Sequence, residues 1–171
     1  QIRALAADLA GRPDAVNSPT PLFVFDAGYN PAALTYDLSG TPVNLTVRLR
    51  NDRVFYADPP PPVPGHGPGR PRRHGARFEC AHPDTWPAPA HHSTGHDHRY
   101  GNIDIQAWPG LHPRISACRG RFAGHEQAPT VRGTIIRVQV DHLPKPTSRA
   151  TTTLWLWAAG PDPDPDQCAH A

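Results

Sequence analysis

The spacing of apolar residues near the start of the chain predicts a helix followed by a short strand. Ile2, Leu5 and Leu9 recur at helical intervals, so residues 2–10 are predicted to form a helix with these side chains on one face. Residues 22–25 are an unbroken apolar run, Leu-Phe-Val-Phe. Such a run predicts a short strand that is buried on both faces, as in a sheet covered by helices.

The next segment continues the alternation of elements. Pro31 suits the first turn of a helix, Asn30 suits its N-cap, and the helix is predicted to run to about Leu38. Apolar and polar residues then alternate from residue 43, which predicts a strand over residues 43–56. Helix, strand, helix and strand in this order indicate an α/β sheet.

The pattern changes after Tyr56. Residues 58–73 are rich in proline and glycine, and residues 82–98 in histidine and proline, so both segments are predicted to be loops. The remaining β-prone segments are residues 77–80, 100–108, 134–142 and 151–159, of which the last two form the strongest pair. Alternating proline and aspartate exclude a helix over residues 161–166.

Composition excludes several protein classes. The net charge of +2 permits a nucleic-acid partner but does not require one. Cys80, Cys118 and Cys168 are odd in number and widely spaced, which argues against a disulfide framework and a zinc ribbon and favours a reducing, cytoplasmic location. No apolar run is long enough for a membrane span, so no membrane partner is expected.

Asp26 is the sharpest candidate for chemistry. It follows directly on the predicted strand over residues 22–25, and functional groups of open α/β sheets gather at the carboxyl ends of strands. A carboxylate there could bind a hard metal ion. Aspartate before a glycine-containing turn is also common as a purely structural residue, so the local sequence leaves both roles open.

Three chemistries use an aspartate in this position. A haloacid-dehalogenase-type phosphotransferase needs a second aspartate two residues later, where Gly28 stands. A response-regulator receiver needs an acidic pair upstream, which the preceding residues do not supply. A two-metal nuclease or strand transferase takes its other carboxylates from distant elements, so a lone Asp26 is compatible with it.

The segment Phe23–Asn30, Phe-Val-Phe-Asp-Ala-Gly-Tyr-Asn, resembles the second-aspartate motif of DDE transposases encoded by bacterial insertion sequences. The resemblance covers roughly residues 20–160. It continues in the same order through further segments, at residues 47–56, 69–75, 131–138, 142–146 and 154–157.

The resemblance implies a ribonuclease-H-like catalytic core interrupted by a β-rich insertion. In this family two aspartates and one glutamate bind divalent ions, usually magnesium, for phosphodiester hydrolysis and strand transfer on DNA. Asp26 matches the second aspartate. The first is expected upstream of this chain and the glutamate downstream, and the prolines keep Asp162, Asp164 and Asp166 off any helix that could replace it. We therefore expect an internal part of a transposase, inactive alone, from a parent that could form homo-oligomers.

The expected fold class is thus α/β, a partial ribonuclease-H-like sheet with a β-rich, loop-rich insertion. Four parts are expected along the chain: residues 1–56 form part of the catalytic core, 57–130 the Pro/Gly/His-rich insertion, 131–160 a hairpin-like pair of strands, and 161–171 a tail.

Two groups of arginines are candidates for DNA contact. The first lies in a Gly/Pro-rich loop and comprises Arg70, Arg72, Arg73 and Arg77. The second follows the aspartate motif and comprises Arg48, Arg50 and Arg53. The alternative for the first group is a solvated loop without a partner. If that loop does bind DNA, a small non-catalytic DNA-binding protein is the alternative function, and a decayed gene product is a third.

Five histidines and a nearby cysteine suggest a zinc hypothesis: His82, His91, His92, His96, His98 and Cys80. Their spacing matches no known zinc pattern, so a solvated polar loop is the preferred interpretation. Trp155 and Trp157 alternate with leucines in a predicted strand, which favours packing in the core over stacking on bases.

Overall fold

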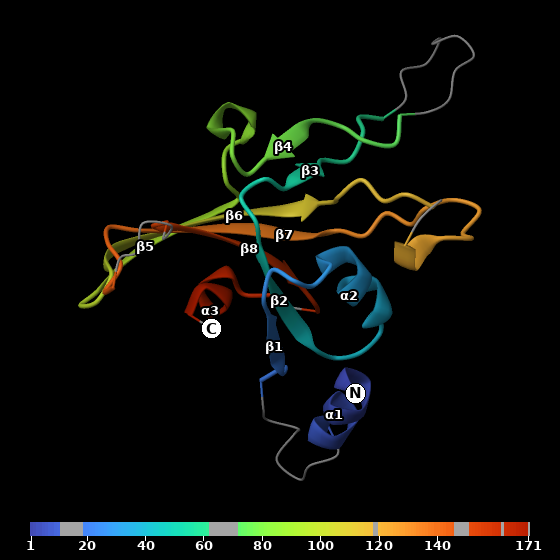
Figure 1. Cartoon of the computed structure of the whole chain (residues 1–171), viewed down its shortest axis with the longest axis horizontal. Helices are drawn as coiled ribbons and strands as arrows, with labels where there is room; N and C mark the ends of the chain where they lie inside the picture. Colours follow the sequence, from blue (N-terminus) through green and yellow to red (C-terminus); the bar gives the residue numbers. More distant parts are fainter. Residues whose placement is uncertain (11–18, 62–71, 118–119, 146–150, 162, 171) are drawn as a thin grey trace.

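The computed structural model describes residues 1–10, 19–61, 72–117, 120–145, 151–161 and 163–170. A six-stranded mixed sheet of strand order β1-β2-β8-β7-β6-β5 forms the body, and a small sheet of β3 and β4 lies on one side of it (Figure 1). The elements are α1 (Ile2–Ala10), β1 (Leu22–Phe25), α2 (Pro31–Asp37), β2 (Asn44–Leu49), β3 (Val54–Tyr56), β4 (Arg77–Glu79), η2 (Pro83–Thr85), β5 (His91–Asp97), β6 (Gly101–Leu111), η3 (Gly120–Phe122), β7 (Gly133–Val140), β8 (Thr153–Ala159) and α3 (Pro165–His170). The expected α/β class is confirmed.

The first strand–helix–strand unit follows the sequence prediction. Strands β1 and β2 run parallel, with Phe25 opposite Val47. The side chain of Asn30 caps α2 by accepting a hydrogen bond from the backbone N–H of Ala33 at 3.2 Å. Gly40 takes a φ of 77° where the helix ends, a conformation that suits glycine.

The prediction of one strand over residues 43–56 is wrong. Strand β2 stops at Leu49, and a turn closed by the bond from the Arg53 amide to the Arg50 carbonyl at 3.3 Å leads into β3. Strand β3 pairs with β4 in the small sheet. Within the large sheet, β2 pairs with β1 on one edge and with β8 on the other.

The burial of side chains on β1 and β2 differs from the prediction, since one residue expected to be buried is exposed and two residues expected on a polar face are buried. Val24 of β1 is 56% exposed because β1 is the edge strand and nothing described covers that side chain. Asn44 and Thr46 of β2, expected on a polar face, are buried because β2 is an interior strand covered on both sides. The apolar face of α1 is also shifted, since Ala6 is buried whereas Leu5 is 48% exposed.

The predicted loop over residues 82–98 contains a strand. Strand β5 pairs antiparallel with β6, from His91 opposite Ala107 to Asp97 opposite Gly101. Its residues carry little β-propensity of their own. The long neighbour β6 supplies the hydrogen-bond partners that make this polar segment extended.

The prediction that no helix forms after residue 161 is wrong at its end. Helix α3 begins with Pro165, and the Asp166 amide donates to the side chain of Asp164 at 2.9 Å. Proline is accepted in the first helical turn, because the N–H that it lacks has no partner within the helix there. Asp166 therefore does lie on a helix, contrary to the expectation.

The large sheet carries apolar clusters on both faces, and Figure 1 shows the β3–β4 sheet and α3 on opposite sides of it. On one face, Trp155 and Trp157 of β8 pack with β2, β3, β4 and α2. On the other, Ile136 and Leu156 pack against Cys168 of α3. The two strands of the strongest predicted β pair, β7 and β8, are confirmed as antiparallel neighbours in the middle of this core.

Candidate functional site at the carboxyl end of the first strand

Asp26 stands where β1 ends and the turn to α2 begins. The turn is closed by the Tyr29 amide, which donates to the Asp26 carbonyl at 3.2 Å. The ring of Tyr29 packs edge-on against Phe25, with centroids 5.2 Å apart. The turn thus holds the Asp26 backbone in place while 76% of its side chain remains exposed.

One ion pair engages the Asp26 carboxylate. A guanidinium nitrogen of Arg48, on the neighbouring strand β2, lies 3.8 Å from its Oδ1. Both side chains are well exposed and the separation is long, so this contact is weak. The carboxylate therefore remains available to a further partner.

The residues around Asp26 do not make a complete metal site. Within the described parts of the chain, no three histidine, cysteine or acidic side chains come together to hold an ion. Magnesium needs an ordered set of oxygens, and one carboxylate beside a guanidinium does not provide it. Asp26 fits the role of one metal ligand, and the described residues do not supply the rest.

Two clefts flank the Asp26 turn. The tryptophan cleft, of about 600 Å³, begins at Ala27, next to Asp26. Its walls combine aromatic rings with cations, and its main side chains are Arg48, Arg50, Trp86, Arg137 and Trp155. A surface of this kind suits a ligand that carries both a planar apolar group and negative charge.

The arginine cleft, of about 430 Å³, begins at Asn30 on the far side of the same turn. Four guanidinium groups line it, those of Arg50, Arg53, Arg114 and Arg121. Arg50 lines both clefts, so the two clefts meet at this residue.

The structure separates the arginines that the sequence suggested for DNA contact. Arg48 contacts Asp26 at 3.8 Å, and Arg50 lines both clefts. Arg73 donates to the Ala128 carbonyl, and Arg77 pairs with Glu79 at 2.9 Å; neither lines these two clefts. Of the two others, Arg72 is exposed and Arg70 lies outside the described residues.

Sequence reasoning did not single out Arg114, Arg121 or Arg137. The first two lie outside the β-prone segments; Arg114 stands among neutral residues, and Arg121 has one charged residue close by, Arg119. They join Arg50 and Arg53 through folding alone, so the sequence pattern carries no signal for them.

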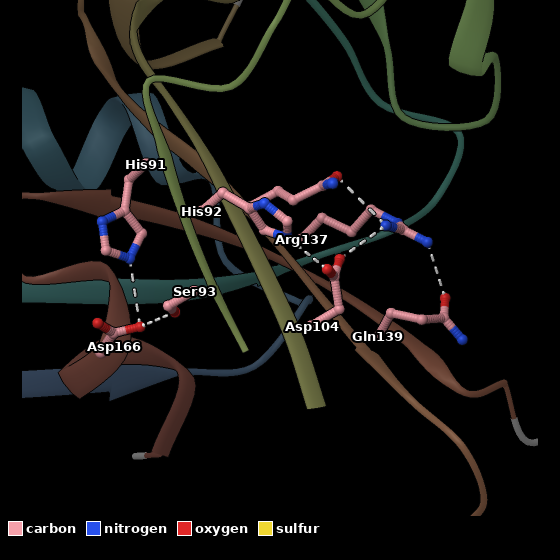
Figure 2. Close-up of polar contacts among 8 residues, drawn as sticks. His91, His92, Ser93, Asp104, Arg137, Gln139 and Asp166 are labelled. Carbon is pink, nitrogen blue, oxygen red and sulfur yellow. Dashed lines mark hydrogen bonds and ion pairs between the residues drawn. The ribbon is translucent and has the colours of Figure 1, made fainter. Parts of the chain in front are cut away.

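Arg137 is held by a polar network across three strands (Figure 2). Asp104 of β6 lies 3.4 Å from Arg137 and 2.6 Å from Nε2 of His92. Gln139 accepts from the same guanidinium at 3.0 Å, and the guanidinium carbon lies 5.4 Å from the centre of the Trp86 ring. The network fixes Arg137 at the rim of the tryptophan cleft.

A second group in Figure 2 joins the C-terminal helix to β5. Oγ of Ser93 donates to Oδ1 of Asp166 at 2.5 Å, and Nε2 of His91 lies 3.3 Å from the same oxygen. The hydrogen bond from Ser93, with the contact of His91, lowers the pKa of Asp166. The serine donates to the carboxylate and not to the imidazole, so this is a docking contact and not a nucleophile with its base.

Two histidines, the buried His112 and the half-buried His74, lie beside strand β3 of the small sheet. Nδ1 of His74 and Nε2 of His112 are 3.0 Å apart, and Asp58 pairs with Arg132 beside them at 2.9 Å. Desolvation lowers the pKa of both imidazoles, aided at His74 by the nearby guanidinium of Arg114. Both rings are therefore neutral at physiological pH.

A comparison with models of known protein families matches residues 1–114 to the family described as DDE superfamily endonuclease. The chain belongs to this family. The DDE resemblance of the Asp26 motif is thereby confirmed at family level, and the mixed sheet is consistent with a ribonuclease-H-like DDE fold. Comparisons with curated proteins and with solved structures gave no match.

Family membership defines the general chemistry. DDE endonucleases act on DNA and generally use divalent metal ions. The matched segment contains Asp26, both basic strand-end residues Arg48 and Arg50, and Arg114 of the arginine cleft. None of the helices in the described parts of the chain has the length and apolar character that crossing a membrane requires.

Proposed function

We propose that this chain is part of the catalytic core of a DDE-type DNA transposase and that Asp26 is one of the carboxylates that bind its magnesium ions. The observation that carries the proposal is the exposed, weakly paired Asp26 at the end of β1, between two clefts lined by arginines. The family match to DDE endonucleases supports the same role.

Electrostatics explain why the arginines belong to this function. A phosphodiester brought to Asp26 meets a like charge, and guanidinium groups on both sides offset that repulsion. Arg48 lies on the adjacent strand and Arg50 lines both clefts. In this proposal they hold the DNA backbone across the Asp26 turn, while a divalent ion, when bound with further carboxylates, would supply the Lewis acid.

DNA binding tests the proposal directly. We expect the purified chain to bind DNA, with affinity that falls as salt rises, and the double substitution Arg48→Ala/Arg50→Ala to weaken binding about tenfold or more at low salt. Arg99→Ala is the matched control, because Arg99 is exposed in the β5–β6 turn, away from both clefts. Equal loss in the control, or no DNA binding at all, would contradict the proposal.

Cleavage provides a second test. Since one carboxylate does not complete a metal site, we propose that the chain alone does not nick DNA when magnesium is added. The assay is conversion of a supercoiled plasmid carrying element ends to its open circle. Magnesium-dependent nicking that disappears in Asp26→Ala would show that these residues form a complete site.

The loop containing Arg70, Arg72, Arg73 and Arg77 is proposed as a secondary DNA contact, supported by the exposure of Arg72. A cytoplasmic location and self-association of the complete transposase belong to the same proposal. Sedimentation of the chain with and without DNA tests self-association, since a mass that stays monomeric in both states would contradict it.

A further inference from the structure

The arginine cleft holds more positive charge than its own acidic residues neutralise. Its lining contains four arginines and one carboxylate, Asp52, which gives a formal charge of +3 (four minus one). The floor is apolar, formed in part by Phe55 and Phe122. A concave cationic surface of this kind attracts anions and strengthens their binding by limiting access of water.

Two of the four arginines already bind carboxylates. Arg121 forms a two-pronged contact with Asp37, through Nε at 3.2 Å and Nη2 at 2.5 Å. Arg50 donates from Nη2 to Asp52 at 3.0 Å. A planar guanidinium binds carboxylate and phosphate oxygens with the same forked geometry. Each aspartate therefore occupies a position in which a phosphate could bind.

The other two arginines have no such partner. The structure shows no ion pair for Arg53 or Arg114 among the residues it describes, and both side chains are exposed. Arg114 lies near His74, whose pKa it lowers, which leaves a cation beside neutral imidazoles. An anion entering the cleft would therefore find two unengaged guanidinium groups and two that are loosely engaged.

We propose that the arginine cleft binds phosphates of the DNA backbone and that Asp37 and Asp52 act as built-in competitors that those phosphates displace. Asn30, at the end of the turn that starts at Asp26, is one of the residues that line the cleft, so the cleft lies close to that turn. The inference rests on the proposed function, because it takes DNA to be the partner. It adds three residues, Arg53, Arg114 and Arg121, to the DNA-binding surface.

Displacement is feasible because the resident ion pairs are solvent-exposed. Both guanidinium groups are more than half exposed, at 59% for Arg121 and 66% for Arg50, so water and salt screen the attraction in both pairs. Without DNA the carboxylates reduce repulsion among the four cations. With DNA each aspartate is released to water, and phosphate oxygens take over its guanidinium.

The distinguishing experiment removes the competitors. Asp37→Asn and Asp52→Asn should each tighten DNA binding about two- to fivefold, the range expected for freeing one exposed ion pair. Asp84→Asn changes the net charge equally at an exposed site outside the cleft, so it is the matched control. Fluorescence anisotropy with a labelled duplex measures all of them, and unchanged melting temperatures verify the fold.

The complementary variant removes the unengaged cations. Arg53→Ala/Arg114→Ala should weaken DNA binding and reduce the slope of log Kd against log salt by about 1.8, since each lost phosphate contact accounts for about 0.9. Inorganic phosphate, titrated against the labelled duplex, should compete for the wild-type chain less effectively once these arginines are gone.

The outcomes separate the two proposals. If Arg48→Ala/Arg50→Ala abolishes DNA binding while the Asp37, Asp52 and Arg53/Arg114 variants bind like wild type, this inference falls and the proposed function stands. Equal tightening by Asp84→Asn reduces the effect to net charge and overturns the inference. Phosphate binding without any change in DNA affinity overturns its DNA part. A chain that binds no DNA overturns both.

Discussion

Carboxylates at opposite ends of the large sheet are held very differently. Asp104, on β6 near one end, contacts His92 at 2.6 Å and Arg137 at 3.4 Å, and its side chain is two-thirds buried. The carboxylate of Asp26, at the end of edge strand β1, has one ion pair among the described residues, with Arg48 at 3.8 Å. The first carboxylate is satisfied within the protein, whereas the second is positioned for a partner from outside.

The difference follows from the position of each strand. Strand β6 has neighbours on both sides, so a polar side chain on it meets other side chains from β5 and β7. Strand β1 has a neighbour on one side, and Asp26 lies past its last paired residue, Phe25. At the end of an edge strand, the sheet and the following turn hold the backbone of a charged residue in place, while its charged group remains exposed to solvent.

The largest expected effect concerns Trp157, which is buried on the interior strand β8 between the two ends of the sheet. Its ring stacks on Phe55, with centroids 5.7 Å apart, and its Nε1 donates to the hydroxyl of Thr35 in α2 at 3.0 Å. Trp157→Ala should lower the free energy of unfolding by about 3–5 kcal/mol, because the buried ring leaves a cavity. Urea denaturation measures it, and Trp157→Phe, which keeps a ring, should cost clearly less. Equal losses in both variants would contradict the packing explanation.

The two carboxylates should also differ in what they contribute to stability. Asp104→Asn should cost about 1–2 kcal/mol, because it weakens charged hydrogen bonds to a half-buried arginine. Asp26→Asn should change stability by less than about 0.5 kcal/mol, since it removes only an exposed contact. Unfolding by urea compares the pair. Similar costs for both substitutions would show that Asp26 is as firmly held as Asp104.

A smaller effect that depends on pH is expected at the pair formed by His74 and His112. The pKa values of His74 and His112 are lowered in the folded chain, so below about pH 6.5 the unfolded chain binds more protons. Stability should therefore fall as pH drops through that window. His74→Gln should flatten the slope of unfolding free energy between pH 5 and about 6.5, while His98→Gln, on an exposed turn, should leave it unchanged. An unaltered slope in His74→Gln would contradict this assignment.

The smallest effect is local and concerns the docking of α3. Asp166 ties this helix to Ser93 and His91, and Cys168 is buried beneath it. Asp166→Ala should speed alkylation of Cys168 about two- to tenfold, the equivalent of losing one such contact. Peptide-resolved mass spectrometry measures the rate, with the exposed Gln167→Ala as control. Equal rates in the two variants would show that Asp166 does not hold the helix.

Elements defined by local signals were predictable. The proline and cap residue of α2 fixed its start, and unbroken β-branched and aromatic runs marked β1, β7 and β8. Asp26 was identified in the same way, because a buried strand, an aspartate and a glycine turn are contiguous in the sequence. Features that depend on residues close together in the sequence could therefore be predicted from the sequence.

Features that depend on distant partners were not predictable. Strand β5 is extended because β6 lies beside it, and residues 54–56 form a separate strand because β4, more than 20 residues later in the chain, pairs with them. The arginine cleft likewise assembles Arg50 and Arg121 from segments about 70 residues apart. Neither the periodicity of apolar residues nor the composition indicates which distant residues come together in this way.

The pairing of β2 with β8 also determines when, during folding, the strand next to the Asp26 turn can complete its hydrogen bonds. Leu45 lies opposite Ala159, so the strand next to the Asp26 turn waits for residues 114 positions later in the chain. Contacts this remote in sequence form slowly, and a ribosome delivers β8 only near the end of these residues. Until β8 is available, the edge of β2 that pairs with it has no hydrogen-bond partner from β8. The end of the sheet that carries the Asp26 turn is therefore completed only after β8 has been made.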